Sequence, residues 1–238
     1  MCRSCASSPL SSPLSRRHVV RAGLGLALAC AALPAGGALA RPAPVDARDA
    51  LKRLLDGNAR YAANTPNQRD FSARRAALAR AQHPFASIVS CADSRVAPEL
   101  AFDQSPGDLF VVRVAGNIVS PEGLASLEFG AAVLRSPLIL VLGHTHCGAV
   151  AAAIDVVRNR TQLPGHLPQL IDAITPAVHA ADRERPADML AATIAANVRL
   201  NVEKLKASTP VLAGLVAEGR LTVAGGVYDL ATGKVALL

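Results

Sequence analysis

The sequence predicts one α/β domain, built on a mainly parallel central β-sheet that is flanked by helices. Two observations lead to this fold class. Three short apolar runs, residues 85–90, 109–114 and 138–142, have the length and composition of buried strands. Segments with apolar residues at helical spacing separate these runs. Strands that alternate with helices in this way usually pair in parallel and carry the helices on the faces of the sheet.

Residues 1–40 are expected to be a twin-arginine export signal rather than part of the fold. Two adjacent arginines, Arg16 and Arg17, precede a short apolar run. Ala38 and Ala40 then offer the small side chains that a signal peptidase needs before its cleavage point. We therefore expect cleavage after position 40.

Two other interpretations of this leader are weaker. The apolar run at 22–33 is shorter than the roughly 20 residues of a membrane span, and Pro34 follows it directly. A lipoprotein would be modified at Cys30, but the residues before that cysteine are a poor approach sequence. We expect a periplasmic or otherwise exported protein without stable membrane insertion, whose mature chain 41–238 is a single domain.

The positive charge of the chain lies partly in this leader. The formal net charge is +7, but four of the 25 basic residues and none of the 18 acidic residues precede position 41, so the mature chain carries +3. Nucleic-acid binding therefore loses its main support. Almost two hundred residues remain, which is enough for one sizeable hydrophobic core.

The N-terminal half of the domain is expected to begin with two helices. Residues 45–61 carry leucines at helical spacing behind Asp46, which can cap the helix, and residues 72–82 form a second, basic helix. The first two strands follow. A crossover helix at 121–134, with a proline in its first turn, then leads to the third strand.

The C-terminal half continues the alternation. Helices are expected at 149–158, 167–180 and 187–206. Residues 221–230 form the last long strand, and residues 235–238 pair with it as a hairpin across a turn at Thr232-Gly233. The sequence contains no internal repeat.

The two cysteines that remain after the leader, Cys91 and Cys147, lie beside other candidate ligands. Cys91 and His144 both come directly after a predicted strand, and ligand sites of open parallel sheets collect at the carboxyl ends of strands. If those two strands are neighbours, Cys91, His144 and Cys147 can converge from two loops. Two thiolates and one imidazole suit tetrahedral Zn²⁺ and leave a fourth position for water, which can then ionise near neutral pH.

A disulfide is the simplest alternative for these cysteines. In an oxidising compartment, a pair of cysteines is most often joined. The neighbours of each cysteine favour the metal instead, because Cys91 is followed by Asp93 and Arg95, and Cys147 is preceded by His144 at a spacing of three.

Two motifs carry a resemblance to a known family. Cys91-Ala92-Asp93-Ser94-Arg95 and the segment Gly143-His144-Thr145-His146-Cys147-Gly148 resemble the two signature motifs of the β-class carbonic anhydrases. Supporting similarity is found at residues 56–61, 82–84, 107–117 and 128–130. The resemblance covers about half of the mature chain and implies the β-carbonic anhydrase fold.

The resemblance implies a role for each motif residue. Cys91, His144 and Cys147 match the three ligands of one zinc ion per subunit. Asp93 and Arg95 match a catalytic dyad in which the arginine holds the carboxylate away from the metal, so that water takes the fourth position. In the family's closed state this pairing breaks and the aspartate itself becomes the fourth ligand.

The resemblance also implies a substrate pocket. Gln82 and Gly148 match hydrogen-bond donors to substrate, and Phe110, Ala115 and Phe129 match the lining of an apolar pocket for CO₂, contributed partly across a dimer interface. The implied reaction is the reversible hydration of carbon dioxide to bicarbonate and a proton. The implied assembly is a homodimer or a homotetramer.

Two alternatives stay open at this point. An enzyme with the same fold could hydrolyse another heteroallene, such as carbon disulfide. A non-enzymatic exported zinc or thiol protein would instead contain a Cys91–Cys147 disulfide.

Overall fold

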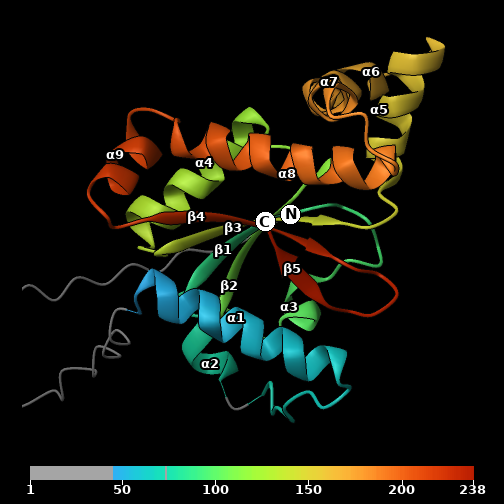
Figure 1. Ribbon diagram of the computed structural model, residues 1–238. Helices are drawn as coiled ribbons and strands as arrows, with labels where there is room; N and C mark the ends of the chain where they lie inside the picture. The colour runs from blue at the N-terminus through green and yellow to red at the C-terminus, as the bar shows by residue number, and fades with distance from the viewer. Residues whose placement is uncertain (1–44, 73) are drawn as a thin grey trace, which may run out of the picture. The chain divides into compact units, whose positions relative to one another are not determined.

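The computed structural model describes residues 45–72 and 74–238, which lie within one compact unit, Arg41–Leu238 (Figure 1). The leader falls outside the described residues, so the export signal, its cleavage and the periplasmic localisation stay predictions. None of the described helices is long and apolar enough to span a membrane.

A five-stranded sheet forms the centre, in the order β2-β1-β3-β4-β5. The strands are β1 (Ala86–Ser90), β2 (Leu109–Arg113), β3 (Leu138–His144), β4 (Thr222–Tyr228) and β5 (Val235–Leu237). The first four are parallel, and β5 pairs antiparallel with β4 as the predicted hairpin. The mainly parallel sheet and each predicted strand are therefore confirmed.

Helices cover both faces of the sheet, because β1 and β3 are apolar on both sides. The side chains of Ile88 and Leu140 lie on one face of the sheet and pack in the same core cluster as α1 (Ala47–Ala62). Val89 and Val141 point to the other face, against α4 (Pro121–Glu128), α8 (Met189–Lys206) and α9 (Val211–Ala217). Figure 1 shows these two layers, with α1, α2 (Arg75–Leu78) and α3 (Pro98–Ala101) on one side and α4, α8 and α9 on the other.

A third group of helices lies beyond the carboxyl end of the sheet. It consists of α5 (Gly148–Asn159), α6 (Leu167–Asp172) and α7 (Thr175–Arg183), which lie together in Figure 1. Their apolar side chains form a separate core cluster, and that cluster includes the side chains of Cys91 and Cys147.

Capping, burial and proline explain where three of the helices begin or end, and why two predicted helices differ from the observed ones. Asp46 caps α1 by accepting a hydrogen bond from the Asp49 amide, as predicted. The predicted helix 72–82 shrinks to the four residues of α2, because none of them is buried and a short helix gains little stability without a packed face. The predicted helix 167–180 divides into α6 and α7, since Pro176 cannot continue a helix across that position.

The remaining differences are short elements without a clear sequence signal. The predicted helix 121–134 becomes α4 followed by one π-helical turn at Phe129–Val133. The helices α3 and α9 and the 3₁₀ turn at Ala115–Asn117 were not predicted. The helix α3 contacts α1 so closely that a side chain at Gly57 would lie 1.8 Å from the Phe102 carbonyl oxygen.

Candidate metal centre

Three sulfur and nitrogen ligands converge at the carboxyl edge of the sheet. Cys91 follows β1, His144 is the last residue of β3, and these strands are hydrogen-bonded neighbours. Cys147 comes from the N-terminus of α5, after a sharp turn in which His146 has a φ of 55°. One ligand atom from each of the three residues lies within 4.8 Å of the other two. The condition under which the three ligands can converge, that the two strands are neighbours, is thus met.

The His144 ring is oriented for a metal. Its Nδ1 lies 2.9 Å from the Thr145 carbonyl oxygen. Because a carbonyl can only accept, Nδ1 carries the proton and Nε2 keeps a free lone pair. Nε2 is buried and has no hydrogen-bond partner among the described residues. A buried acceptor without a partner costs about 1–3 kcal/mol, and a cation between Nε2 and the two sulfurs removes that cost. The residues present therefore fit a soft divalent metal such as zinc.

The two thiols lie side by side, and their pKa values are shifted in opposite directions. The neighbouring Cys147 thiol is the main cause of a lowered pKa of Cys91, although burial opposes it. The Cys91 sulfur also accepts from the amides of Gly116, at 3.2 Å, and Asp93, at 3.4 Å. The neighbouring Cys91 thiol, followed by burial, raises the pKa of Cys147. Both cysteines are free, so the disulfide alternative is not the arrangement present here.

Asp93 and Arg95 form a bidentate ion pair beside the three ligands. Arg95 donates from Nε to Oδ1 at 2.9 Å and from Nη2 to Oδ2 at 2.7 Å, and its backbone amide donates to Oδ1 at 2.9 Å. These bonds, the side-chain ones first, hold the pKa of Asp93 well below its usual range. Asp93 Oδ2 lies 3.9 Å from His144 Nε2. The carboxylate is therefore ionised, close to the ligands and restrained by the arginine.

Arg113, at the end of β2, was not singled out in the sequence. Its guanidinium donates to the carbonyl oxygen of Cys91 at 3.0 Å and to that of Asp93 at 2.7 Å, which fixes the backbone between them. Arg113 pairs in register with Ser90, the residue before Cys91. A long basic side chain at the carboxyl end of the neighbouring strand was the available signal.

The predicted substrate residues fall into two groups. Ala115 precedes Gly116, which contacts Cys91, and Gly148 directly follows Cys147, with open space where its side chain would be. The other three, Gln82, Phe110 and Phe129, lie away from the ligands of their own chain.

The strand register shows how far away they are. Phe110 lies opposite Ser87, four residues before Cys91, which is about 13 Å along an extended strand. Its ring centre is 6.4 Å from that of Phe129, so the two rings form one apolar patch. Gln82 is exposed and precedes β1. One chain therefore does not bring these three residues to the metal centre.

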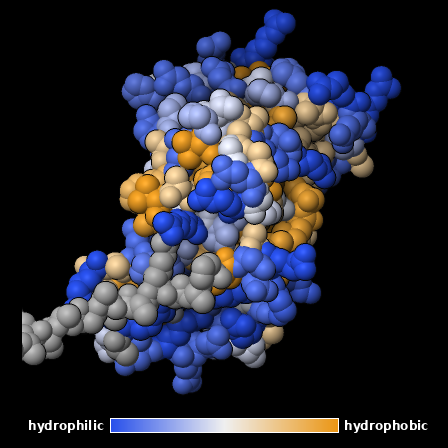
Figure 2. Space-filling model, turned by 90° about the vertical axis from the view of Figure 1, so that its left-hand side faces the viewer, coloured by the Kyte–Doolittle hydropathy of each residue, from blue (hydrophilic) through white to orange (hydrophobic). Residues whose placement is uncertain are grey.

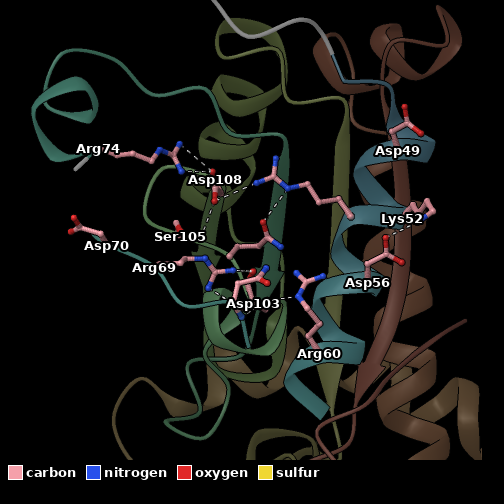
Figure 3. Close-up of a pocket in the computed structure, with 13 residues that line it drawn as sticks. Asp49, Lys52, Asp56, Arg60, Arg69, Asp70, Arg74, Asp103, Ser105 and Asp108 are labelled. Carbon is pink, nitrogen blue, oxygen red and sulfur yellow. Dashed lines mark hydrogen bonds and ion pairs between the residues drawn. The ribbon is translucent and has the colours of Figure 1, made fainter. Parts of the chain in front are cut away.

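A charged hollow of about 670 Å³ lies elsewhere, between α1 and the loop that precedes β2 (Figure 3). Asp103 is buried at its base and binds Arg60 and Arg69, each at 2.6 Å. Asp108 accepts more loosely, at 3.4 Å, from Arg53 and from Arg74. Its lining carries as many acidic as basic side chains, and its best-defined contacts are internal ion pairs. We interpret this hollow as structural.

Asp103→Asn should destabilise the fold by about 3 kcal/mol, because two arginines lose their buried partner. Urea unfolding at pH 7 measures this loss. Asp56→Asn, which breaks the exposed Lys52–Asp56 pair, is the control and should cost under about 0.5 kcal/mol. Equal losses in the two variants would contradict the buried role of Asp103.

The pH dependence of the Asp103 effect has a defined sign. Burial alone would raise the pKa of Asp103, but hydrogen bonds from Arg60, Arg69 and the Asn67 amide outweigh it and lower the pKa below 3.8. Stabilisation by this carboxylate is therefore complete above that value and is lost as the pH falls through the folded-state pKa. The difference between the wild type and Asp103→Asn should persist from pH 7 to pH 5 and shrink in stronger acid.

The fold and the site define an α/β protein with a Cys-His-Cys cluster that could hold a metal ion at the carboxyl edge of a parallel sheet. A family model for carbonic anhydrase matches residues 86–235, and a carbonic anhydrase of Mycolicibacterium smegmatis is 38% identical over 79% of this chain and 91% of its own. The solved Coccomyxa β-carbonic anhydrase in complex with acetazolamide, 31% identical, superimposes with a TM-score of 0.63 over 79% of this chain and 86% of that one. The chain therefore belongs to the β-class carbonic anhydrase family of enzymes.

Two further relatives agree with this result. A carbonic anhydrase of Pseudomonas aeruginosa is 36% identical over 78% of this chain and 86% of its own length. A tetrameric β-carbonic anhydrase of Sordaria macrospora, 27% identical, gives a TM-score of 0.62 over 68% of this chain and 84% of that chain. The predicted resemblance and fold are thus confirmed.

Proposed function

We propose that this protein catalyses the reversible hydration of carbon dioxide to bicarbonate and a proton, with one zinc ion held by Cys91, His144 and Cys147. The observation that carries the proposal is the buried Nε2 of His144, which has no partner among the described residues and shares a 4.8 Å cluster with two cysteines. Membership of the carbonic anhydrase family supports the choice of reaction.

A zinc ion in this position would lower the pKa of a bound water to about 7 and so supply hydroxide near neutral pH. The chain itself contributes an apolar environment around the metal ligands. The cysteines belong to an apolar cluster with Ile118 and Ile174, which favours an uncharged substrate over water. Such a site suits CO₂, whose electrophilic carbon needs a nucleophile and whose oxygens are weak acceptors.

Asp93 is the group placed to handle the proton. Its carboxylate is ionised and lies 3.9 Å from His144 Nε2, so it can accept a hydrogen bond from a water beside the three ligands. Arg95 binds both carboxylate oxygens and so restrains them from moving closer to the metal ligands. We therefore assign Asp93 to orienting the water or accepting its proton, and Arg95 to holding Asp93. Gly148, next to Cys147, would donate its amide to bound substrate.

Substrate choice is tested by comparing two heteroallenes on zinc-loaded protein. Stopped-flow measurements with a pH indicator follow the hydration of CO₂ and, separately, the hydrolysis of carbon disulfide. We expect rapid CO₂ hydration and little or no hydrolysis of carbon disulfide. Hydrolysis of carbon disulfide without CO₂ hydration would overturn the proposal in favour of the other substrate.

We further propose that the working unit is a homodimer or a homotetramer. The Phe110–Phe129 patch lies about four strand residues from the metal centre of its own chain, so it can line a CO₂ pocket only in another subunit. Phe129 is 47% exposed, and Figure 2 shows that apolar patches interrupt the hydrophilic surface on one side of the molecule. Gln82 is exposed as well and could reach substrate in the same way.

Phe129→Asp is expected to dissociate the oligomer, because a carboxylate in a closely packed apolar contact would be buried without a partner. Light scattering should show the lower mass, and CO₂ hydration should fall about 10- to 100-fold with zinc retained. Phe71→Asp, at another phenyl that is 55% exposed, is the control and should change neither property. A fully active oligomer of Phe129→Asp would refute the shared pocket.

A further inference from the structure

The turn at Ala115–Asn117 delivers a hydrogen bond to the metal centre from outside both motifs. The Gly116 amide lies 3.2 Å from the Cys91 sulfur. Gly116 and Asn117 both have positive φ, 72° and 46°, so the turn contains two successive residues in the left-handed region. Glycine adopts this region freely and asparagine tolerates it, but the direction of the Gly116 amide still depends on contacts from outside the turn.

Three polar side chains on one face of helix α8 bind the backbone of this turn and of the residues after it. Asn197 donates from Nδ2 to the Gly116 carbonyl oxygen at 2.8 Å. One turn later, Asn201 accepts from the Val119 amide at 3.0 Å. Lys204 then donates to the Val119 carbonyl oxygen at 2.7 Å. The spacing of four and three residues places these side chains along one side of the helix.

The amide of Asn197 is held in one orientation. Asn197 is 2% exposed, and its Oδ1 faces the Nδ2 of Asn201 at 3.2 Å. Because the Gly116 carbonyl can only accept, the NH₂ group of Asn197 must point to it. Gly116 is also confined on its other side, since a side chain there would lie 2.6 Å from Cδ1 of Ile174. The position of the Gly116 peptide is therefore set by Asn197 and by this packing.

We propose that Asn197 is a positioning residue for the metal centre. By holding the Gly116 carbonyl, it keeps the amide of the same residue directed at the Cys91 sulfur, although Asn197 lies 81 residues away and contacts no ligand. A hydrogen bond to a metal-bound thiolate fixes the sulfur's lone pairs and withdraws charge from it, and loss of such an outer contact typically weakens metal binding 10- to 100-fold. This inference rests on the proposed zinc site.

The test compares Asn197→Leu with wild-type protein and with Thr193→Val. Thr193 is fully buried on the same helix, and its hydroxyl donates to the Met189 carbonyl oxygen, so Thr193→Val also loses one buried hydrogen bond without touching the turn. Zinc affinity is measured by competition with a chromophoric chelator. The thiolate-to-metal charge-transfer band is recorded after substitution with Co²⁺.

For Asn197→Leu we expect zinc affinity to fall about 10- to 100-fold and the charge-transfer band to move to longer wavelength, because the thiolate loses a donor. Thr193→Val should leave both unchanged. A folded Asn197→Leu protein with wild-type affinity and an unshifted band would overturn the inference. If that variant does not fold, Asn197→Ser, whose hydroxyl is too short to reach Gly116, takes its place under the same criteria.

The two proposals fail in different ways. Wild-type protein that binds no stoichiometric zinc would contradict the proposed function. Wild-type protein that binds zinc, together with an Asn197 variant that binds it equally well, would contradict only the positioning role.

Discussion

Cys147→Ser is expected to bind no stoichiometric zinc and to lose more than about 100-fold in the rate of CO₂ hydration. Removal of a residue that only contacts a metal ligand costs up to about 100-fold, and loss of a ligand itself should cost more. Cys147 is 1% exposed and its thiol belongs to the three-ligand cluster with Cys91 and His144, so its loss removes one of the two sulfur ligands. Serine keeps nearly the same volume, but its hydroxyl is a much poorer ligand for zinc than a thiolate. Mass spectrometry of the native protein and stopped-flow hydration measure the two losses.

The neighbour in the same turn provides the control. His146 is exposed and has a φ of 55°, a conformation that asparagine tolerates well. His146→Asn should therefore keep both zinc and activity. Zinc binding by Cys147→Ser at wild-type affinity, with the fold intact by circular dichroism, would show that Cys147 is not a ligand.

Arg95→Leu is expected to keep its zinc but to reduce CO₂ hydration by about 10²- to 10⁴-fold, the range for loss of a positioned proton-transfer group. Arg95 binds both oxygens of Asp93, whose Oδ2 already lies 3.9 Å from His144 Nε2. Without the arginine, the Asp93 carboxylate is free to turn toward the ligands and take the fourth coordination position of the metal in place of water. The Co²⁺ spectrum should report this change in coordination.

The pH dependence of the Arg95→Leu activity distinguishes movement of the Asp93 carboxylate from its protonation. The hydrogen bonds from Arg95 lower the pKa of Asp93, so their removal returns it toward 3.8. At pH 6 to 8 the carboxylate stays ionised in both proteins, so protonation of Asp93 does not account for the defect of Arg95→Leu in this range. Arg220→Leu is the matched control, because Arg220 forms a similar exposed pair with an acid two residues before it, Glu218, at 2.8 Å. An active Arg95→Leu enzyme with an unchanged Co²⁺ spectrum would exclude the restraint.

Much of the sheet and of the central site could be predicted because both depend on local patterns. The apolar runs at β1 and β3 end within one or two residues of Cys91 and His144, and parallel pairing of these strands then brings the ligands together. The motifs themselves identify Asp93 and Arg95, whose contacts are between residues two apart.

Contacts between distant residues could not be predicted in this way. Arg113 bonds to Cys91 across 22 residues and Asn197 to Gly116 across 81 residues, and neither lies in the two signature motifs. The break between α6 and α7 follows from one proline inside an otherwise helical pattern. The parallel register puts Phe110 at the opposite end of the strands from Cys91, and Phe129 lies beside Phe110. Gln82 precedes β1 and so lies before the same end of the sheet.

The most direct test of the central claim is a zinc titration followed by stopped-flow CO₂ hydration at alkaline pH. Metal-free protein is loaded with increasing zinc, and the hydration rate is measured at each step. Activity should rise linearly and level off at one zinc ion per chain. Fully zinc-loaded, folded protein that hydrates CO₂ no faster than buffer alone would contradict the assignment.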